Sequence, residues 1–221
     1  MIRPLFLGSR HGTTNDNLSN EYRGWSTGPD AHLNETGRSI IRKNAMTVKR
    51  MGFTFPLIIT DSLPRTLESA KIYQEILEIP ELEIDDRART VNVGDLTGKS
   101  KTDNPLTQYF QHPNKRIPGG ETVNEFRHRQ AELYADIMGL VEQFKQPVFV
   151  LFHGANISYL YNHFNNPANP VMYEGIVNTG GVVMFYTGGI VPITELRGKD
   201  PSFSAALNFL MPEILPSLVK V

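Results

Sequence analysis

Apolar residues along this chain are grouped in two ways, as short uninterrupted runs and at the three- and four-residue spacing of a helix. The runs predict buried strands, and the spaced groups predict amphipathic helices. Taken in chain order, the strands are expected within residues 3–9, 56–62, 81–90 and 147–154 and as a hairpin over 180–196, and the helices over 33–52, 63–79, 121–144 and 155–164.

Strands and helices alternate in this prediction, which favours an α/β fold. We expect a three-layer sandwich in which a mostly parallel central sheet is flanked by helices. No internal repeat or linker is evident, so residues 1–221 are expected to form a single domain. Between Val91 and Gly120 the apolar pattern weakens, which predicts a lid or insertion. The apolar residues 200–221 predict a C-terminal extension that packs on the body or on a partner chain, so a homodimer stays open.

The chain has 221 residues, of which 40% are hydrophobic and 20% charged, and a formal net charge of −1. This composition is typical of a soluble globular protein, and the near-neutral charge gives no support to a nucleic-acid or membrane partner. No cysteine is present, which excludes disulfides, thiolate metal sites and cysteine nucleophiles. Because the sequence also lacks a signal-peptide pattern and any apolar run near the ~18 residues of a membrane span, we expect a cytoplasmic protein.

Three of the predicted strands end in polar side chains. The strand over 3–9 is followed by "RH", the strand over 56–62 ends in "TDS", and the strand over 147–154 ends in "HG". Ligands of parallel sheets bind beyond the carboxyl ends of the strands. We therefore expect His11, His153 and the neighbouring arginines to converge on one edge of the sheet.

Two histidines with arginines beside them point to an anion site. Arg10 precedes His11, and Arg65 begins the helix over 63–79, where a helix start adds positive potential and free N–H groups. Arginine binds phosphate oxygens in a bidentate way, and a neutral imidazole among cations can attack phosphorus. A metal cluster is disfavoured, since there is no His-Glu-x-x-His pattern. Each residue also has a purely structural interpretation, as a histidine at a strand end or an arginine that begins an exposed helix.

These residues belong to longer stretches that resemble the motifs of the histidine phosphatase superfamily, whose fold is phosphoglycerate-mutase-like. "SRHGTTNDN" resembles its Arg-His-Gly signature, "TDSLPRTLESA" is similar to its Ser-x-x-x-Arg-x-x-x-Ser/Thr-Ala segment, and "VFVLFHGANI" is similar to its second-histidine strand. "GWSTGPDAHLNETGR", "IPGGETVNEFRHR" and "VNTGGVVMF" resemble further segments in the family's order. The matches run from Leu5 to Val183 and cover most of the chain.

The resemblance implies a role for each matching residue. His11 takes the place of the nucleophile that becomes a phosphohistidine. The side chains that match the family's phosphate pocket and its phosphate contacts are Arg10, Arg65, His153, Asn17 and Thr14. Of the phosphate contacts, Asn17 and Thr14 also suit a turn that caps the next segment.

The chain departs from the family at the group that protonates the leaving oxygen. Many members carry a Glu there, and the matching stretch "TVNVGDLTG" has Thr90 in its place. Another branch has an Asp directly after the second histidine, where this chain has Gly154. Threonine cannot donate a proton as a carboxylic acid would, so Asp95 and Glu121 are the nearest acids by sequence. The alternatives are a substrate with a good leaving group, such as an acyl phosphate, or slow turnover.

The resemblance implies a phosphatase that hydrolyses a phosphate monoester of a small molecule, without a cofactor or metal, through a phosphohistidine on His11. Two other functions use the same pocket. One is a phosphate-ligand binding or interaction module with little catalysis, and the other is a phosphoglycerate mutase, which retains its product while it reorients.

Overall fold

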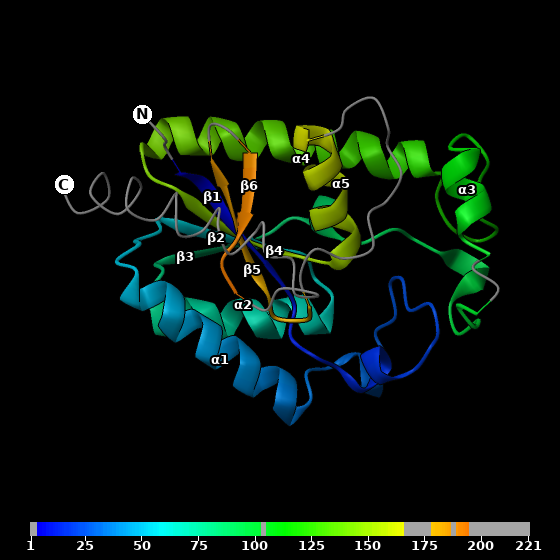
Figure 1. The fold of residues 1–221 in the computed structure, drawn as a ribbon, viewed down its shortest axis with the longest axis horizontal. Coiled ribbons are helices and arrows are strands. Elements are labelled where there is room, and N and C mark those ends of the chain that lie inside the picture. The colour runs from blue at the N-terminus through cyan, green and yellow to red at the C-terminus, as the bar shows by residue number, and fades with distance from the viewer. Residues whose placement is uncertain (1–3, 103–104, 166–177, 187–188, 195–221) are drawn as a thin grey trace.

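The computed structural model describes residues 4–102, 105–165, 178–186 and 189–194 (Figure 1). Within this part of the chain, the six strands are β1 (Pro4–Arg10), β2 (Leu57–Thr60), β3 (Glu81–Ile84), β4 (Val148–Phe152), β5 (Val182–Tyr186) and β6 (Gly189–Pro192). The α-helices of the same part are α1 (Glu35–Arg50), α2 (Pro64–Leu77), α3 (Thr107–Gln111), α4 (Val123–Phe144) and α5 (Gly154–Asn165). Each strand and helix that the apolar pattern predicts is present, with ends that differ by a few residues.

The strands form one sheet in the order β3-β2-β4-β1-β5-β6. Neighbouring strands from β3 to β1 run parallel, and β5 and β6 add an antiparallel edge next to β1. Helices α1 and α2 cover one face of the sheet, and α4 and α5 cover the other (Figure 1). The structure confirms the three-layer α/β sandwich, in which β1 to β4 make up the parallel part of a mixed sheet.

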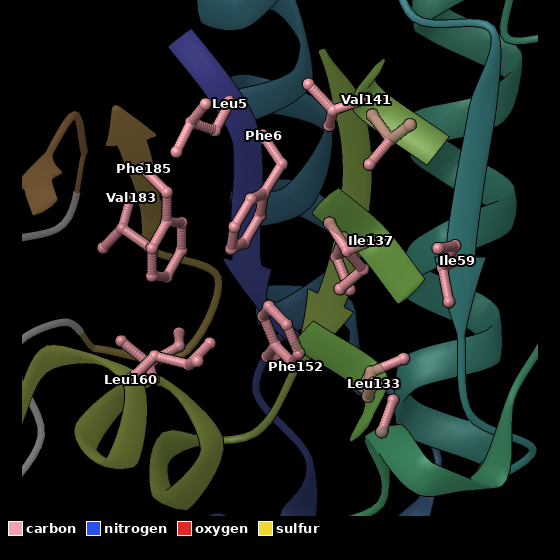
Figure 2. Packing of buried hydrophobic residues seen from close by; sticks show 14 of the residues in the cluster. Leu5, Phe6, Ile59, Leu133, Ile137, Val141, Phe152, Leu160, Val183 and Phe185 are labelled. Carbon is pink, nitrogen blue, oxygen red and sulfur yellow. The ribbon is translucent and has the colours of Figure 1, made fainter. Parts of the chain in front are cut away.

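Successive residues of a strand point to opposite sides of the sheet, so an uninterrupted apolar run such as that of β4 makes both faces apolar. In β4, Phe152 packs in the cluster under α4 and α5, while Phe149 packs in the cluster under α1 and α2. Figure 2 shows the first of these clusters, where Phe6 of β1 stacks on Phe185 of β5 with ring centroids 4.0 Å apart. Phe6 also contacts Phe152 of β4, so aromatic rings from three neighbouring strands pack against one another on this face.

The helices on the opposite face begin where capping chemistry places them, slightly later than the apolar spacing predicts. The side-chain oxygen of Asn34 accepts the Gly37 N–H at 2.9 Å, so α1 begins at Glu35. Helix α2 begins at Pro64, whose fixed φ and missing N–H suit the first helical position. It ends where Glu78 adopts the left-handed conformation, with a φ of 56°.

Residues 91–120, predicted as a lid or insertion, include a 3-10 turn over Gly94–Leu96 and the short helix α3. They contribute to a third apolar cluster, in which Ile117 and Phe126 are fully buried. The segment is therefore folded around a small core, and its role as a lid stays a prediction. The predicted extension over 200–221 and the end of the predicted hairpin lie outside the described residues. In the part that is described, no helix combines the length and apolarity needed to cross a membrane.

Two helical glycines test this packing in opposite directions. A Cβ added to Gly37 in α1 would lie 2.1 Å from the backbone oxygen of Thr13, whereas one added to Gly139 in α4 would meet nothing within 4 Å. We expect Gly37→Ala to lower the free energy of unfolding by about 1–3 kcal/mol, because the backbone must shift. Gly139→Ala should raise it by about 0.5–1 kcal/mol, since alanine favours helix. Urea denaturation measures both, and changes of the same sign would contradict this packing.

Candidate active site

The two histidines lie side by side because β1 and β4 pair in parallel register. Arg10, the last residue of β1, pairs with Phe152, the last residue of β4, and His11 and His153 follow directly. The ladder continues one step further, since the His11 N–H donates to the Phe152 carbonyl at 3.0 Å. The two imidazole rings lie 5.0 Å apart, edge to face at 60°. The structure thus brings together the histidines that the strand ends predict at one edge of the sheet.

His11 is buried, and its ring is oriented by the next residue. Its Nδ1 lies 2.8 Å from the Gly12 carbonyl oxygen. Because a carbonyl oxygen only accepts hydrogen bonds, Nδ1 carries the proton and the neutral ring has its lone pair on Nε2. Burial, followed by repulsion from His153 when that ring is protonated and from the charges of Arg65 and Arg10, holds the pKa of His11 well below its usual value. At neutral pH, His11 is therefore an uncharged imidazole with an unprotonated Nε2.

Arg10 packs against the backbone that follows β4. A Cβ added to Gly154 would lie 3.4 Å from the guanidinium carbon of Arg10. The charge of Arg10 also contributes to the lowered pKa of both His11 and His153. On the other side of β1, the Arg10 N–H donates to the Gly181 carbonyl at 2.9 Å, which fixes its backbone. A positive charge therefore lies next to the two rings.

Arg65 lies in the first turn of α2 and is only 4% exposed, so its interpretation as the start of an exposed helix is wrong. Its guanidinium donates to the carbonyl oxygens of Gly24 at 2.7 Å and Ser26 at 3.2 Å. Burial lowers the pKa of Arg65, while the carboxylates of Asp61 and Asp16 act to raise it. Arg65 therefore holds a second loop against the site and adds a buried cation to it.

Thr14 and Asn17 cap the 3-10 turn that begins after the first motif. Thr14 Oγ1 accepts the Asn17 N–H at 3.2 Å, and Asn17 Oδ1 accepts the Thr14 N–H at 3.1 Å. This reciprocal pair is a capping box, the role that turn chemistry predicts for these residues. A contact between either side chain and a phosphate stays a prediction.

Asp61 is a site residue to which the sequence assigns no role. It is fully buried directly after β2, and its Oδ2 lies 2.7 Å from His153 Nε2. Its Oδ1 accepts the Leu63 N–H at 2.7 Å and the Thr66 hydroxyl at 2.6 Å. Burial acts to raise the pKa of Asp61, but these three donors outweigh it and hold the pKa below its usual value. Its place in "TDS", at the end of a strand, is the signal by which it could have been found.

His153 is the second buried histidine of the site. Burial lowers its pKa to about 4, although the carboxylate of Asp61 acts in the opposite direction. At neutral pH, His153 is therefore uncharged and donates its Nε2–H to Asp61.

Thr90, in the position where the resemblance predicts an acid, has a firmly held backbone. Its carbonyl oxygen accepts the Trp25 indole N–H at 2.7 Å and a guanidinium N–H of Arg129 at 2.7 Å. Arg129 also donates to the carbonyl oxygens of Arg87 at 2.6 Å and Arg89 at 2.5 Å. The backbone at this position is fixed by its neighbours, and the side chain has no acidic proton.

The two carboxyls proposed as the acid lie in different surroundings. Glu121 forms an ion pair with Arg129 at 2.8 Å, and the same oxygen accepts the Asn92 N–H at 2.7 Å. Asp95 is exposed in the 3-10 turn over Gly94–Leu96. The geometry therefore favours a structural role for Glu121, and the assignment of either acid stays a prediction. Among the residues described, no group of three or more His, Asp or Glu side chains is arranged to hold a metal ion.

Comparison with known proteins shows which family the sequence matches. The sequence model of the histidine phosphatase superfamily (branch 1) matches residues 7–189. The uncharacterized phosphatase PhoE of Bacillus subtilis is 29% identical over 175 residues, which are 76% of this chain and 81% of PhoE. A 2,3-bisphosphoglycerate-dependent phosphoglycerate mutase of Methylobacterium radiotolerans is 28% identical over 163 residues, which are 69% of this chain and 75% of that one.

One solved structure with the same fold is the mycobacterial glucosyl-3-phosphoglycerate phosphatase. It superposes with a TM-score of 0.69 at 19% sequence identity, over 90% of this chain and 100% of that one. The likeness shows that this chain has a phosphoglycerate-mutase-like fold.

The two buried histidines should make stability depend on pH. Their folded-state pKa values lie below the unfolded value of 6.5, so below this pH the unfolded chain binds more protons than the native one. We expect the free energy of unfolding to fall by up to about 1.4 kcal/mol per pH unit for each histidine as the pH is lowered from 6.5 toward 4. Urea denaturation between pH 7 and pH 5 measures this slope. His153→Gln should remove one histidine's share, and an unchanged slope would contradict a neutral His153.

Proposed function

The chain belongs to the histidine phosphatase superfamily, and we propose that it is a phosphatase that hydrolyses a phosphate monoester of a small molecule through a phosphohistidine on His11. The state of His11 carries this proposal, since it is buried and neutral with its proton on Nδ1. Arg10 and Arg65 both lie close enough to lower its pKa. A lone pair on Nε2 among arginines is what attack on a phosphate dianion requires, because the cations lower the electrostatic barrier.

The reaction has two steps in this proposal. Nε2 of His11 attacks phosphorus, an N–P bond forms as the P–O bond breaks, and the electron pair leaves with the alcohol oxygen. Water then attacks phosphorus, the N–P bond breaks and inorganic phosphate departs. The phosphoryl oxygens are held throughout by Arg10, Arg65 and His153, and Asn17 and Thr14 are proposed as further contacts.

Protonation of the leaving oxygen is the step for which the chain has no evident catalytic acid at the expected position, since Thr90 stands there. Both carboxylate oxygens of Glu121 are engaged by Arg129, at 2.8 and 3.1 Å, which leaves Asp95 as the better proposal for the acid. Asp95 is exposed, and Thr90 carries no acid. The site therefore suits substrates whose leaving group is stable without a proton, such as acyl phosphates, phosphohistidine or pyrophosphate.

The names of similar proteins support hydrolysis. PhoE and the mycobacterial structure are both named phosphatases. The phosphoglycerate mutase relative makes mutase activity the second candidate. Interconversion of 2- and 3-phosphoglycerate in the presence of a bisphosphate primer would favour the mutase, whereas release of inorganic phosphate without a primer favours the phosphatase.

Substitution of the proposed nucleophile tests the phosphatase directly. His11→Ala should lower the hydrolysis of an aryl phosphate by about 10³-fold or more, because no other group forms the N–P bond. His128→Ala is the matched control, since that side chain is 78% exposed and should leave the rate unchanged. Equal activity of His11→Ala and the wild type would remove His11 from the mechanism. Thermal stabilisation by phosphate without turnover of any phosphoester would instead favour a binding module.

Restoring a carboxyl at position 90 tests the explanation of the leaving group. Thr90→Glu should raise the hydrolysis rate of an alkyl phosphate by about 10²–10⁴-fold, the usual value of a general acid. An aryl phosphate, which has a better leaving group, should gain much less. Thr90→Gln has the same shape without the acidic proton, so an equal gain from glutamine would contradict the prediction.

A further inference from the structure

We propose that Asp61 is a positioning residue that fixes a proton on Nε2 of His153, so that a phosphate dianion binding at this edge draws one further proton onto Nδ1 of His153. This inference rests on the proposed function in one respect, the place of the anion. It concerns the second histidine and is separate from the identity of the nucleophile.

The carboxylate of Asp61 is held in one orientation. Its Oδ1 accepts two hydrogen bonds from the start of α2, the Leu63 N–H at 2.7 Å and the Thr66 hydroxyl at 2.6 Å. The start of a helix also favours a negative charge. Oδ2 is left to face His153, and with exposures of 0% and 3% water does not compete for this contact.

This contact decides which nitrogen of His153 carries a proton. A carboxylate only accepts hydrogen bonds, so Nε2, at 2.7 Å, must be the donor. Neutral His153 therefore has its lone pair on Nδ1, and no hydrogen bond to that nitrogen is found among the residues that the structure describes. A lone pair repels phosphate oxygens, so neutral His153 cannot donate to an anion from Nδ1.

An anion changes the balance of charge around His153. The charged or titratable groups that face it are Asp61 after β2, Arg65 in α2, and Arg10 and His11 of the β1 end. In the unliganded site, burial and the two arginines keep a proton off Nδ1. A bound dianion offsets the arginine charges and attracts the proton. The imidazolium then has a negative partner at each nitrogen, because Asp61 already occupies Nε2.

Removal of the Asp61 charge predicts a different behaviour. In the variant Asp61→Asn, the side-chain amide can keep the Leu63 and Thr66 contacts through its oxygen and turn its N–H toward Nε2 of His153. The proton of the neutral ring then sits on Nδ1, which can donate to the anion directly. The variant therefore binds the anion without taking up a proton.

Calorimetry of sulfate binding counts these protons. Sulfate is a tetrahedral dianion that does not titrate near neutral pH, so any proton taken up on binding goes to the protein. Titrations at pH 6.5 in buffers of different ionisation enthalpy should give about one proton for the wild type. The dissociation constant should also rise about tenfold per pH unit over the range in which only the complex is protonated.

Asp61→Asn should give a proton count near zero and a dissociation constant that does not change with pH. The affinity itself does not discriminate, because loss of a carboxylate would by itself strengthen anion binding. Asp86→Asn is the matched control, since Asp86 accepts the Ser62 N–H in the adjacent loop without contacting His153. It should retain the wild-type count, and a zero count in the wild type would overturn the proposal.

His11→Asn separates the two histidines. Proton uptake on sulfate binding should persist in this variant. If His11→Asn takes up no proton while Asp61→Asn still takes up one, the proton belongs to His11 and the proposal is overturned. Since His11→Asn is inactive under the proposed function, uptake without turnover distinguishes the two ideas. If Asp61→Asn does not fold, ¹⁵N spectra of wild-type His153 decide. They should show a proton on Nε2 alone, and on both nitrogens after sulfate is added. Protonated Nδ1 in the free protein would overturn the proposal.

Discussion

The register between β1 and β4 is the constraint on which the site depends. Because the two strands are parallel and pair Arg10 with Phe152, the residues that follow them emerge at the same edge of the sheet. A slip of one residue would turn these side chains to the opposite face. The aromatic core resists such a slip, since Phe6 packs against both Phe152 and Phe185. Apolar packing in the middle of the sheet therefore sets the distance between two histidines at its edge.

The site combines strong positive charge with histidines that stay neutral. Arg65 is buried and donates to two carbonyl oxygens, which satisfy two of its five N–H donors without cancelling its charge. The buried carboxylates of Asp61 and Asp16 do cancel part of it. The remaining charge disfavours protonated histidine and favours an incoming anion. In the proposed mechanism, the arrangement that lowers the pKa of His11 also leaves it with the lone pair that attacks the dianion.

The elements and the convergence of the histidines follow from local patterns in the sequence. The inner strands β2 and β4 are buried on both faces, so they appear as apolar runs, and the polar residues that end those runs are easy to see. The partner of His153 is less accessible to such reasoning, because Asp61 lies 92 residues away in the chain. Their contact depends on β2 lying next to β4, an order that strand patterns do not specify. The hydrogen bond from Arg65 to the Gly24 carbonyl could not be predicted either, because it joins a helix to an irregular loop that is distant in the sequence.

The close approach of α1 to the segment after His11 restricts one side of the site. Gly37 leaves no room for a side chain beside Thr13, whose carbonyl oxygen also accepts the Asn34 N–H at 3.1 Å. The Thr13 hydroxyl lies 2.6 Å from that of Thr179, so this segment has contacts with both α1 and the residues before β5. These contacts join the segment after His11 to α1 and to Thr179, which precedes β5. If the chain is the proposed phosphatase, we expect substrate and product to pass a part of the site other than this segment.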